Sequence, residues 1–264
     1  MTTSSSERDD AASPVSAVTT TIALRATSFV LLAAIWEIAA TTAGSRTLPT
    51  VEVVAKVLVA AAESGDLFHH LGITLARVVA AFSMAMAAGT ALGLAMGRWR
   101  SLDLVFDGWV VLLLNLPALV ITVLAYVWFG LTEAAAIGAV ALNKVPLVAV
   151  TMREGARALD RDYAELATAY HLSAWKRFRH IVAPQLAPFF LVAARSGLSL
   201  IWKIVLVVEL LGRSDGIGFK LQLFFQLFDV PDILAYALAF AGVVQLIEWT
   251  ILRPIDRLVG SWRR

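Results

Sequence analysis

Long apolar runs are the feature that most restricts how this chain can fold. The hydrocarbon core of a bilayer is about 30 Å thick, and a helix needs about 20 mainly apolar residues to cross it. Six runs approach or exceed that length: residues 26–43, 73–96, 104–126, 133–152, 186–211 and 231–252. With 59% hydrophobic residues and a mean hydropathy of +0.77, the chain is more apolar than soluble domains. We therefore predict an all-α integral membrane protein with about six transmembrane helices.

The basic residues orient these spans. Lys and Arg gather at the cytoplasmic ends of transmembrane helices. One set of span ends carries most of them: Arg8, Arg25, Arg98, Arg100, Arg153, Arg157, Arg161, Lys176, Arg177, Arg179, Arg253, Arg257, Arg263 and Arg264. The opposite ends carry only Arg46, Lys56, Arg213 and Lys220. This asymmetry predicts that both termini are cytoplasmic, and it accounts for the net charge of +2 without a nucleic-acid partner.

Composition divides the chain into five segments. Residues 1–20 are rich in Ser, Thr, Asp and Ala, which predicts a disordered cytoplasmic tail and not a cleaved signal peptide. Residues 21–47 hold an N-terminal transmembrane helix. Residues 48–72 contain an amphipathic helix expected on the extracytoplasmic surface. Residues 73–257 form the main transmembrane domain, and residues 258–264 form a basic cytoplasmic tail.

A polar segment, residues 153–184, separates the fourth and fifth apolar runs. Small and apolar residues recur at helical spacing from Ala164 to Tyr170, with charged residues between them. Ser173 can cap a second helix, which we expect to end at Pro184 because proline is poorly tolerated inside helices. The segment therefore predicts two short amphipathic helices, joined by a tight corner, that face the cytoplasm and present a helix to a soluble partner.

The spacing in this segment resembles the loop signature of ABC importer permeases. That signature is Glu-Ala-Ala, three residues, Gly, nine residues, Ile, one residue and Leu-Pro. The matching positions in this chain are Glu165, Leu166, Ala167, His171, Ile181, Ala183 and Pro184. Leu166, His171 and Ala183 replace the Ala, Gly and Leu of the signature. The change to His171 affects the turn, since glycine often supplies a positive φ that histidine adopts less readily.

Further motifs between residues 48 and 257 look like the nitrate, sulfonate and taurine branch of these permeases. They are Leu48-Pro-Thr-Val-Glu-Val-Val, Gly97-Arg-Trp-Arg, Tyr126-Val-Trp-Phe-Gly-Leu-Thr-Glu and Val208-Glu-Leu-Leu-Gly. The resemblance implies a type I (MetI-like) permease core of five helices plus an extra N-terminal helix, in a bacterial inner membrane. It also implies a homodimer with a second permease copy, a cytoplasmic ABC ATPase dimer and an extracytoplasmic substrate-binding protein. The implied solute is a small anion such as nitrate, a sulfonate, taurine or bicarbonate.

In such a permease the segment 153–184 contains the coupling helix, which enters a groove on the ATPase. An amphipathic helix can dock there as a rigid lever. The resemblance assigns this role to Tyr163, Glu165, Leu166, Ala167, Tyr170, His171, Ile181 and Pro184. The sequence contains no Gly-x-x-x-x-Gly-Lys-Ser/Thr phosphate loop, so we expect the partner ATPase to bind ATP and Mg²⁺. We predict no cofactor and no enzymatic activity for this chain.

Polar residues at membrane depth are candidates for the translocation pathway. They are Asn115, Asn143, Lys144, Lys203 and Glu209. A lysine deep in a bilayer is costly unless it is paired or hydrated, and two such cations would suit an anionic solute. The alternative is that the lysines pair with Glu209, Glu248 or Glu37 and hold helices together. The sequence leaves both interpretations open.

Glycines and prolines also mark the spans. Glycines at every fourth position, Gly89, Gly93 and Gly97, form a stripe that lets another helix approach closely. Pro117 and Pro146 are expected to interrupt the third and fourth spans. The adjacent histidines His69 and His70 do not share a helix face, so no metal site is predicted.

Three other functions compete with an anion importer. An ion-coupled secondary transporter would have inverted halves with paired broken helices, and the sequence has no matching halves. A membrane-embedded enzyme would need a His, Asp or Glu cluster at one depth. The same permease role for a non-anionic solute, such as a vitamin precursor, is the remaining alternative.

Overall fold

The computed structural model describes residues 14–43 and 48–252. Its α-helices are α1 Pro14–Ala43, α2 Val51–Glu63, α3 Asp66–Arg98, α4 Arg100–Asn115, α5 Ala118–Phe129, α6 Glu133–Arg157, α7 Arg161–Ala169, α8 Ala174–Arg177, α9 Ala183–Gly212, α10 Ile217–Leu227 and α11 Val230–Ile247. Two π-helical turns, η1 Phe178–Val182 and η2 Glu248–Leu252, follow α8 and α11. No strand occurs among the described residues, and the all-α prediction is confirmed.

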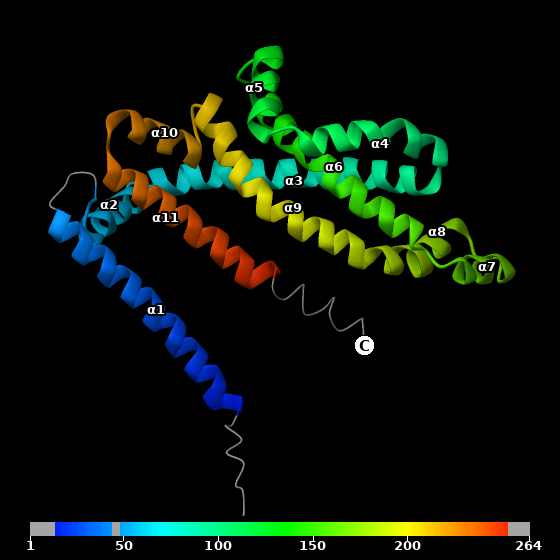
Figure 1. Cartoon of the computed structure of the whole chain (residues 1–264), viewed down its shortest axis with the longest axis horizontal. Helices are drawn as coiled ribbons and strands as arrows, with labels where there is room; N and C mark the ends of the chain where they lie inside the picture. The colour runs from blue at the N-terminus through cyan, green and yellow to red at the C-terminus, as the bar shows by residue number, and fades with distance from the viewer. Residues whose placement is uncertain (1–13, 44–47, 253–264) are drawn as a thin grey trace, which may run out of the picture.

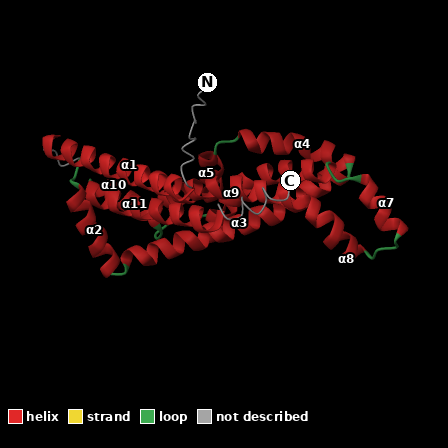
Figure 2. Cartoon of the chain, turned by 90° about the horizontal axis from the view of Figure 1, so that it is seen from below, coloured by secondary structure: helices red, strands yellow, loops and turns green. Residues whose placement is uncertain are grey.

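The longest helices run along the long axis of the molecule (Figure 1). Helices α7 and α8 lie at one end, and α2 and α10 lie at the other, as both views show (Figure 2). Helix α1 extends away from the other helices and approaches them near α2. We call the two extremities the α7–α8 end and the α10 end.

Within the described ranges, four helical segments are long and apolar enough to cross a membrane: Asp66–Arg98, Glu133–Arg157, Ala174–Gly212 and Val230–Thr250. The pair α4 and α5 forms a fifth if it is counted as one broken span, and Thr27–Thr42 in α1 is a shorter apolar segment. The chain is a multi-pass membrane protein.

Helices α3 and α6 pack closely because of the glycine stripe. A Cβ atom added at Gly89 would lie 2.5 Å from the Cβ of Val148, and one added at Gly97 would lie 2.5 Å from the Cβ of Ala156. Both distances are shorter than real Cβ contacts, so only glycine allows this approach. Gly93, between them, lies equally close to α6.

The two predicted proline interruptions have different outcomes. At Pro117 the third predicted span breaks into α4 and α5, whose axes differ by 102°. At Pro146 the prediction is wrong, since α6 is a continuous helix from Glu133 to Arg157. Helix α6 packs along both α3 and α9, and this packing stabilises a continuous helix where a proline alone would favour a break.

Three predicted boundaries need correction. Residues 66–72 belong to α3 and not to the amphipathic helix, because Gly65, with a φ of 78°, ends one helix and begins the next. Pro184 does not end a helix; helical structure continues through it from Ala174 to Gly212, and the π-helical turn η1 ends just before it. Helix α1 begins at Pro14, inside the predicted tail 1–20. Residues 1–13, 44–47 and 253–264, including the predicted basic tail 258–264, lie outside the described residues.

Candidate functional site

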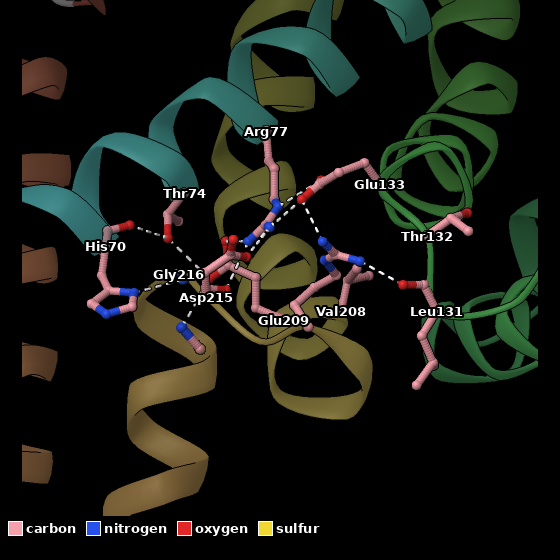
Figure 3. Close-up of polar contacts among 12 residues, drawn as sticks. His70, Thr74, Arg77, Leu131, Thr132, Glu133, Val208, Glu209, Asp215 and Gly216 are labelled. Carbon is pink, nitrogen blue, oxygen red and sulfur yellow. Dashed lines mark hydrogen bonds and ion pairs between the residues drawn. The ribbon is translucent and has the colours of Figure 1, made fainter.

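Arg77 of α3 is the centre of an ion cluster at the α10 end (Figure 3). Its side chain is only 4% exposed. Nη1 donates to Glu209 Oε1 at 2.8 Å, Nε donates to Glu133 Oε2 at 3.0 Å, and Nη2 also bonds to Asp215. Three carboxylates from α9, α6 and the α9–α10 connection therefore meet one guanidinium. We call these four residues the Arg77 cluster.

Glu209 links this cluster to the start of α10. Its side chain is fully buried, and Oε2 accepts hydrogen bonds from Thr74 Oγ1 at 2.9 Å and from Gly218 N at 2.8 Å. The N–H of Ile217 donates to Thr74 Oγ1, and that of Gly216 donates to Nδ1 of His70. Side chains of α3 and α9 thus satisfy the N–H groups that a helix start leaves free.

Arg213 extends the cluster toward α6. It donates to the Leu131 carbonyl at 2.6 Å and to Glu133 Oε1 at 2.7 Å. For Asp215, burial raises the pKa, but the hydrogen bond from Arg77 and the charges of Arg77 and Arg213 lower it by more, so the net pKa is depressed. The connection between α9 and α10 is therefore held by ionised groups.

These contacts bear on one predicted site residue. Glu209 is predicted either to line the pathway or to pair with another helix, and in the structure it is enclosed by protein and bonded to Arg77, not to a lysine. Arg77 and its partners Glu133 and Asp215 are not among the site residues predicted from the sequence. The available signal was that Arg77 and Glu209 are opposite charges inside two apolar spans, a combination that favours pairing.

The two candidate pathway lysines have no carboxylate partner among the described residues. Glu209 binds Arg77, Glu248 lies 3.6 Å from Arg195, and Glu37 accepts from Val51 N at 2.8 Å at the start of α2. The predicted alternative of lysine–glutamate pairs therefore does not occur with these three glutamates.

Lys144 and Lys203 occupy different surroundings. Lys144 of α6 is 2% exposed and lies one helical turn from Val140 and from Val148, which belong to separate apolar clusters of the core. Lys203 of α9 is exposed on the surface of the protomer. Asn143 is half-buried. Asn115 is exposed at the end of α4 and donates to the Val111 carbonyl of its own helix at 2.8 Å, so it does not join the lysines.

Helices α7 and α8 are capped by residues of their own segment. Asp160 accepts from Asp162 N at 2.9 Å, and Ser173 accepts from Lys176 N. At the end of α7, Leu172 N donates to the Ala167 carbonyl and His171 N donates to the Thr168 carbonyl. This is a Schellman motif, and His171 occupies its left-handed position with a φ of 49°. The histidine thus adopts the conformation that the glycine of the signature would supply.

The α7–α8 end exposes large apolar side chains. Tyr170 is 73% exposed and Trp175 is 67% exposed, with Trp175 stacked on Phe178 at a centroid distance of 6.0 Å. Of the residues predicted for ATPase coupling, Tyr163, Glu165, Leu166 and His171 are also exposed. Ala167 is only 2% exposed, so it cannot belong to a docking face as predicted. Ile181 and Pro184 are half-buried and connect the segment to α9.

A cavity of about 680 Å³ lies where α4, α5 and α6 diverge. Trp109, Leu113, Leu124 and Leu142 are among its lining residues, all of which are apolar. It offers no group that would bind a polar solute. No cluster of metal-ligating side chains occurs within residues 14–43 and 48–252.

Known proteins resemble this chain along most of its length. Residues 85–248 match the family described as "Binding-protein-dependent transport system inner membrane component". The chain is 29% identical over 235 residues to the putative aliphatic sulfonates transport permease protein SsuC of Escherichia coli K12, covering 88% of each chain. It is 25% identical over 246 residues to the nitrate import permease protein NrtB of Synechocystis sp. PCC 6803, covering 89% of this chain and 88% of that one.

A taurine permease and a solved structure add to these matches. The taurine transport system permease protein TauC of Escherichia coli K12 is 25% identical over 218 residues, covering 81% of this chain and 79% of TauC. A solved structure titled as an amino acid ABC transporter with histidines shares the fold, with a TM-score of 0.59, 22% identity and coverage of 76% of this chain and 97% of that one. The chain belongs to the binding-protein-dependent transport system inner membrane component family, and is the permease subunit of an ABC importer.

Proposed function

We propose that this permease carries a small anion across the membrane and is driven by a separate cytoplasmic ATPase that docks on α7 and α8. The observation that carries the coupling role is the exposed face of Tyr170, Trp175 and Phe178 on helices that are capped within their own segment. A rigid helical unit with exposed aromatic side chains fits a groove on a soluble partner. The ATPase then supplies ATP and Mg²⁺ chemistry, and this chain transmits the motion.

The side assignment follows from charge. The α7–α8 end carries Lys176, Arg177 and Arg179, which fits a cytoplasmic location in a bacterial inner membrane. The α10 end then faces the extracytoplasmic binding protein. A second copy of this chain completes the permease dimer.

Two observations support an anionic solute. The relatives are named as permeases for aliphatic sulfonates, taurine and nitrate, and each of these solutes carries an oxyanion group. Within the spans of this chain, Lys144 and Lys203 are cations without a carboxylate partner among the described residues. A cation at membrane depth that no carboxylate neutralises favours an anion over a neutral or cationic solute.

Single cysteines test the docking role, because the chain has no native cysteine. Tyr170→Cys should crosslink to a cysteine placed in the ATPase groove. Ala167→Cys is the matched control from the same helix, and its burial should prevent the crosslink. Labelling of Tyr170→Cys by an impermeant reagent added outside intact cells would place α7 on the wrong side of the membrane for an ATPase.

Calorimetry of the cognate binding protein tests the solute class. We expect heat of binding with at least one of nitrate, taurine, an alkanesulfonate and bicarbonate. Binding of only a neutral or cationic compound, such as a vitamin precursor, would reject the anionic solute and leave the coupling role intact.

A further inference from the structure

One face of α9 has an unusual distribution of polarity for a membrane helix. Arg195, Ser199 and Lys203 follow each other at intervals of four residues and all three are exposed. Four residues advance an α-helix by about 6 Å and return close to the same side, so these side chains form one stripe. The opposite side of α9, which includes Ile201, is buried in the protomer.

The stripe lies in the middle of the span. Helix α9 runs from Ala183 to Gly212, and exposed apolar residues, Val192 and Val207, lie on the same side beyond each end of the stripe. A surface in contact with lipid has the reverse order, apolar at mid-depth and polar near the headgroups. Lipid is therefore a poor occupant for this face.

The two cations of the stripe differ in whether a carboxylate lies nearby. Arg195 lies 3.6 Å from Glu248 of η2. Lys203 has no hydrogen bond or ion pair with any described residue. Direct burial of this face against a second copy across a two-fold axis would bring two unpaired lysines together, which is unfavourable without water or an anion between them.

We propose that the stripe Arg195, Ser199 and Lys203 lines a water-filled path at the centre of the permease and that Lys203 gives this path its preference for anions. This proposal rests on the proposed function, because the path has a transport role only if the chain carries an anion. Lys203 then acts as a specificity-determining residue at mid-depth. Lys144 cannot share this role in the described conformation, because it is buried inside the protomer.

Cysteine accessibility tests the stripe without knowledge of the solute. Ser199→Cys gives the permease a single thiol, one helical turn from Lys203. In the purified complex with its ATPase, we expect this thiol to react with an anionic methanethiosulfonate reagent faster than with a cationic one. Ile201→Cys, buried on the opposite side of α9, should be unreactive with both.

Removal of the lysine charge should change the preference. A unit charge about 6 Å away in water changes the rate of each charged reagent by about threefold, in opposite directions, so Lys203→Gln should lower the anionic-to-cationic rate ratio by about tenfold. Lys203→Arg should retain the ratio. The matched control is Lys56→Gln on α2, whose lysine pairs with Glu52 on the protein surface, and it should leave the ratio unchanged.

Two results would overturn the inference. The first is a Ser199→Cys thiol that reacts with neither reagent in the assembled complex, since the face would then be covered. The second is a rate ratio that Lys203→Gln does not alter. The Ser199→Cys thiol could prefer the anionic reagent even if calorimetry shows that the binding protein takes only a neutral compound. That combination would reject the proposed solute class and still support the charged path.

Discussion

The two ends of this permease are stabilised in opposite ways. At the α10 end, the first N–H groups of α10 donate to side chains of α3 and α9, and the Arg77 cluster joins α3 to three other parts of the chain. At the α7–α8 end, the caps come from the same short segment, and the aromatic side chains face outward. One end is fixed to the membrane helices by buried charges, whereas the other is a self-capped unit with an apolar face available to another molecule.

The difference has an energetic cause. A buried charge is costly unless its partners hold it in good geometry, so the Arg77 cluster is stable only while its helices keep one arrangement. Local caps and a Schellman motif require no such arrangement of distant helices. We therefore expect mutations at the α10 end to affect folding and mutations at the α7–α8 end to affect assembly.

The largest expected effect is that of Arg77→Met. It leaves Glu209 buried without its ionic partner, and we expect a loss of about 3–5 kcal/mol in stability. Thermal unfolding of the purified permease would measure this loss. Arg157→Met is the matched control, since Arg157 is 42% exposed and pairs with Asp103 near the α7–α8 end. Its loss should be about 1 kcal/mol or less. Equal losses in the two variants would contradict the contrast between the ends.

Lys144→Met tests whether the loss of stability in Arg77→Met comes from the carboxylates left without a partner or from replacing a buried cation. No described carboxylate is left unpaired when Lys144 is replaced, and the buried ammonium itself is unfavourable. We expect an unchanged stability or a gain of about 1–4 kcal/mol, the opposite sign to Arg77→Met. Lys56→Met on the surface should change little in the same unfolding assay. A loss as large as that of Arg77→Met would reveal an anionic partner for Lys144.

These residues also show what the sequence can predict. Apolar length and glycine spacing were sufficient to predict the four long spans, the broken α4–α5 pair and the α3 stripe, because both depend on local periodicity, whereas the first predicted span is only a shorter apolar segment, Thr27–Thr42. The Arg77–Glu209 bond joins residues 132 positions apart, and no local pattern encodes such a pair. Pro117 and Pro146 had the same predicted effect, but only Pro117 breaks its helix, since α6 is held by α3 and α9.

The helices of the α7–α8 segment could also be predicted from local residue spacing, but their packing against the rest of the chain could not. Its two helices and the cap at Ser173 follow from residue types at fixed spacings. The burial of Ala167 could not be predicted, since it depends on how α7 lies against the rest of the chain. The family signature identified the segment but did not separate docking residues from packing residues.

Trp175→Ala should affect assembly and leave folding almost unchanged. Exposed aromatic residues that become buried in an interface contribute about 2 kcal/mol or more, so we expect the affinity for the ATPase to fall by about 30-fold. Stability of the isolated permease should change by about 0.5 kcal/mol or less. Binding of the purified ATPase to permease in nanodiscs would measure the affinity. Trp128→Ala, an exposed tryptophan on α5, is the matched control; an equal effect there would argue against docking at α8.

The smallest expected effect is a stabilisation by His171→Gly. A non-glycine residue in the left-handed conformation destabilises the folded state by about 1–2 kcal/mol. Glycine avoids this strain, but it loses more conformational entropy on folding, which offsets about 0.5–1 kcal/mol of the gain. The net gain of about 0.5–1 kcal/mol should raise the hydrogen-exchange protection of the α7 amides by about two- to fivefold. Thr168→Gly, placed where α7 is helical, is the matched control and should lower protection by a similar factor. If His171→Gly lowers protection as well, the histidine side chain itself stabilises the corner, and the self-capped description of this end would be incomplete.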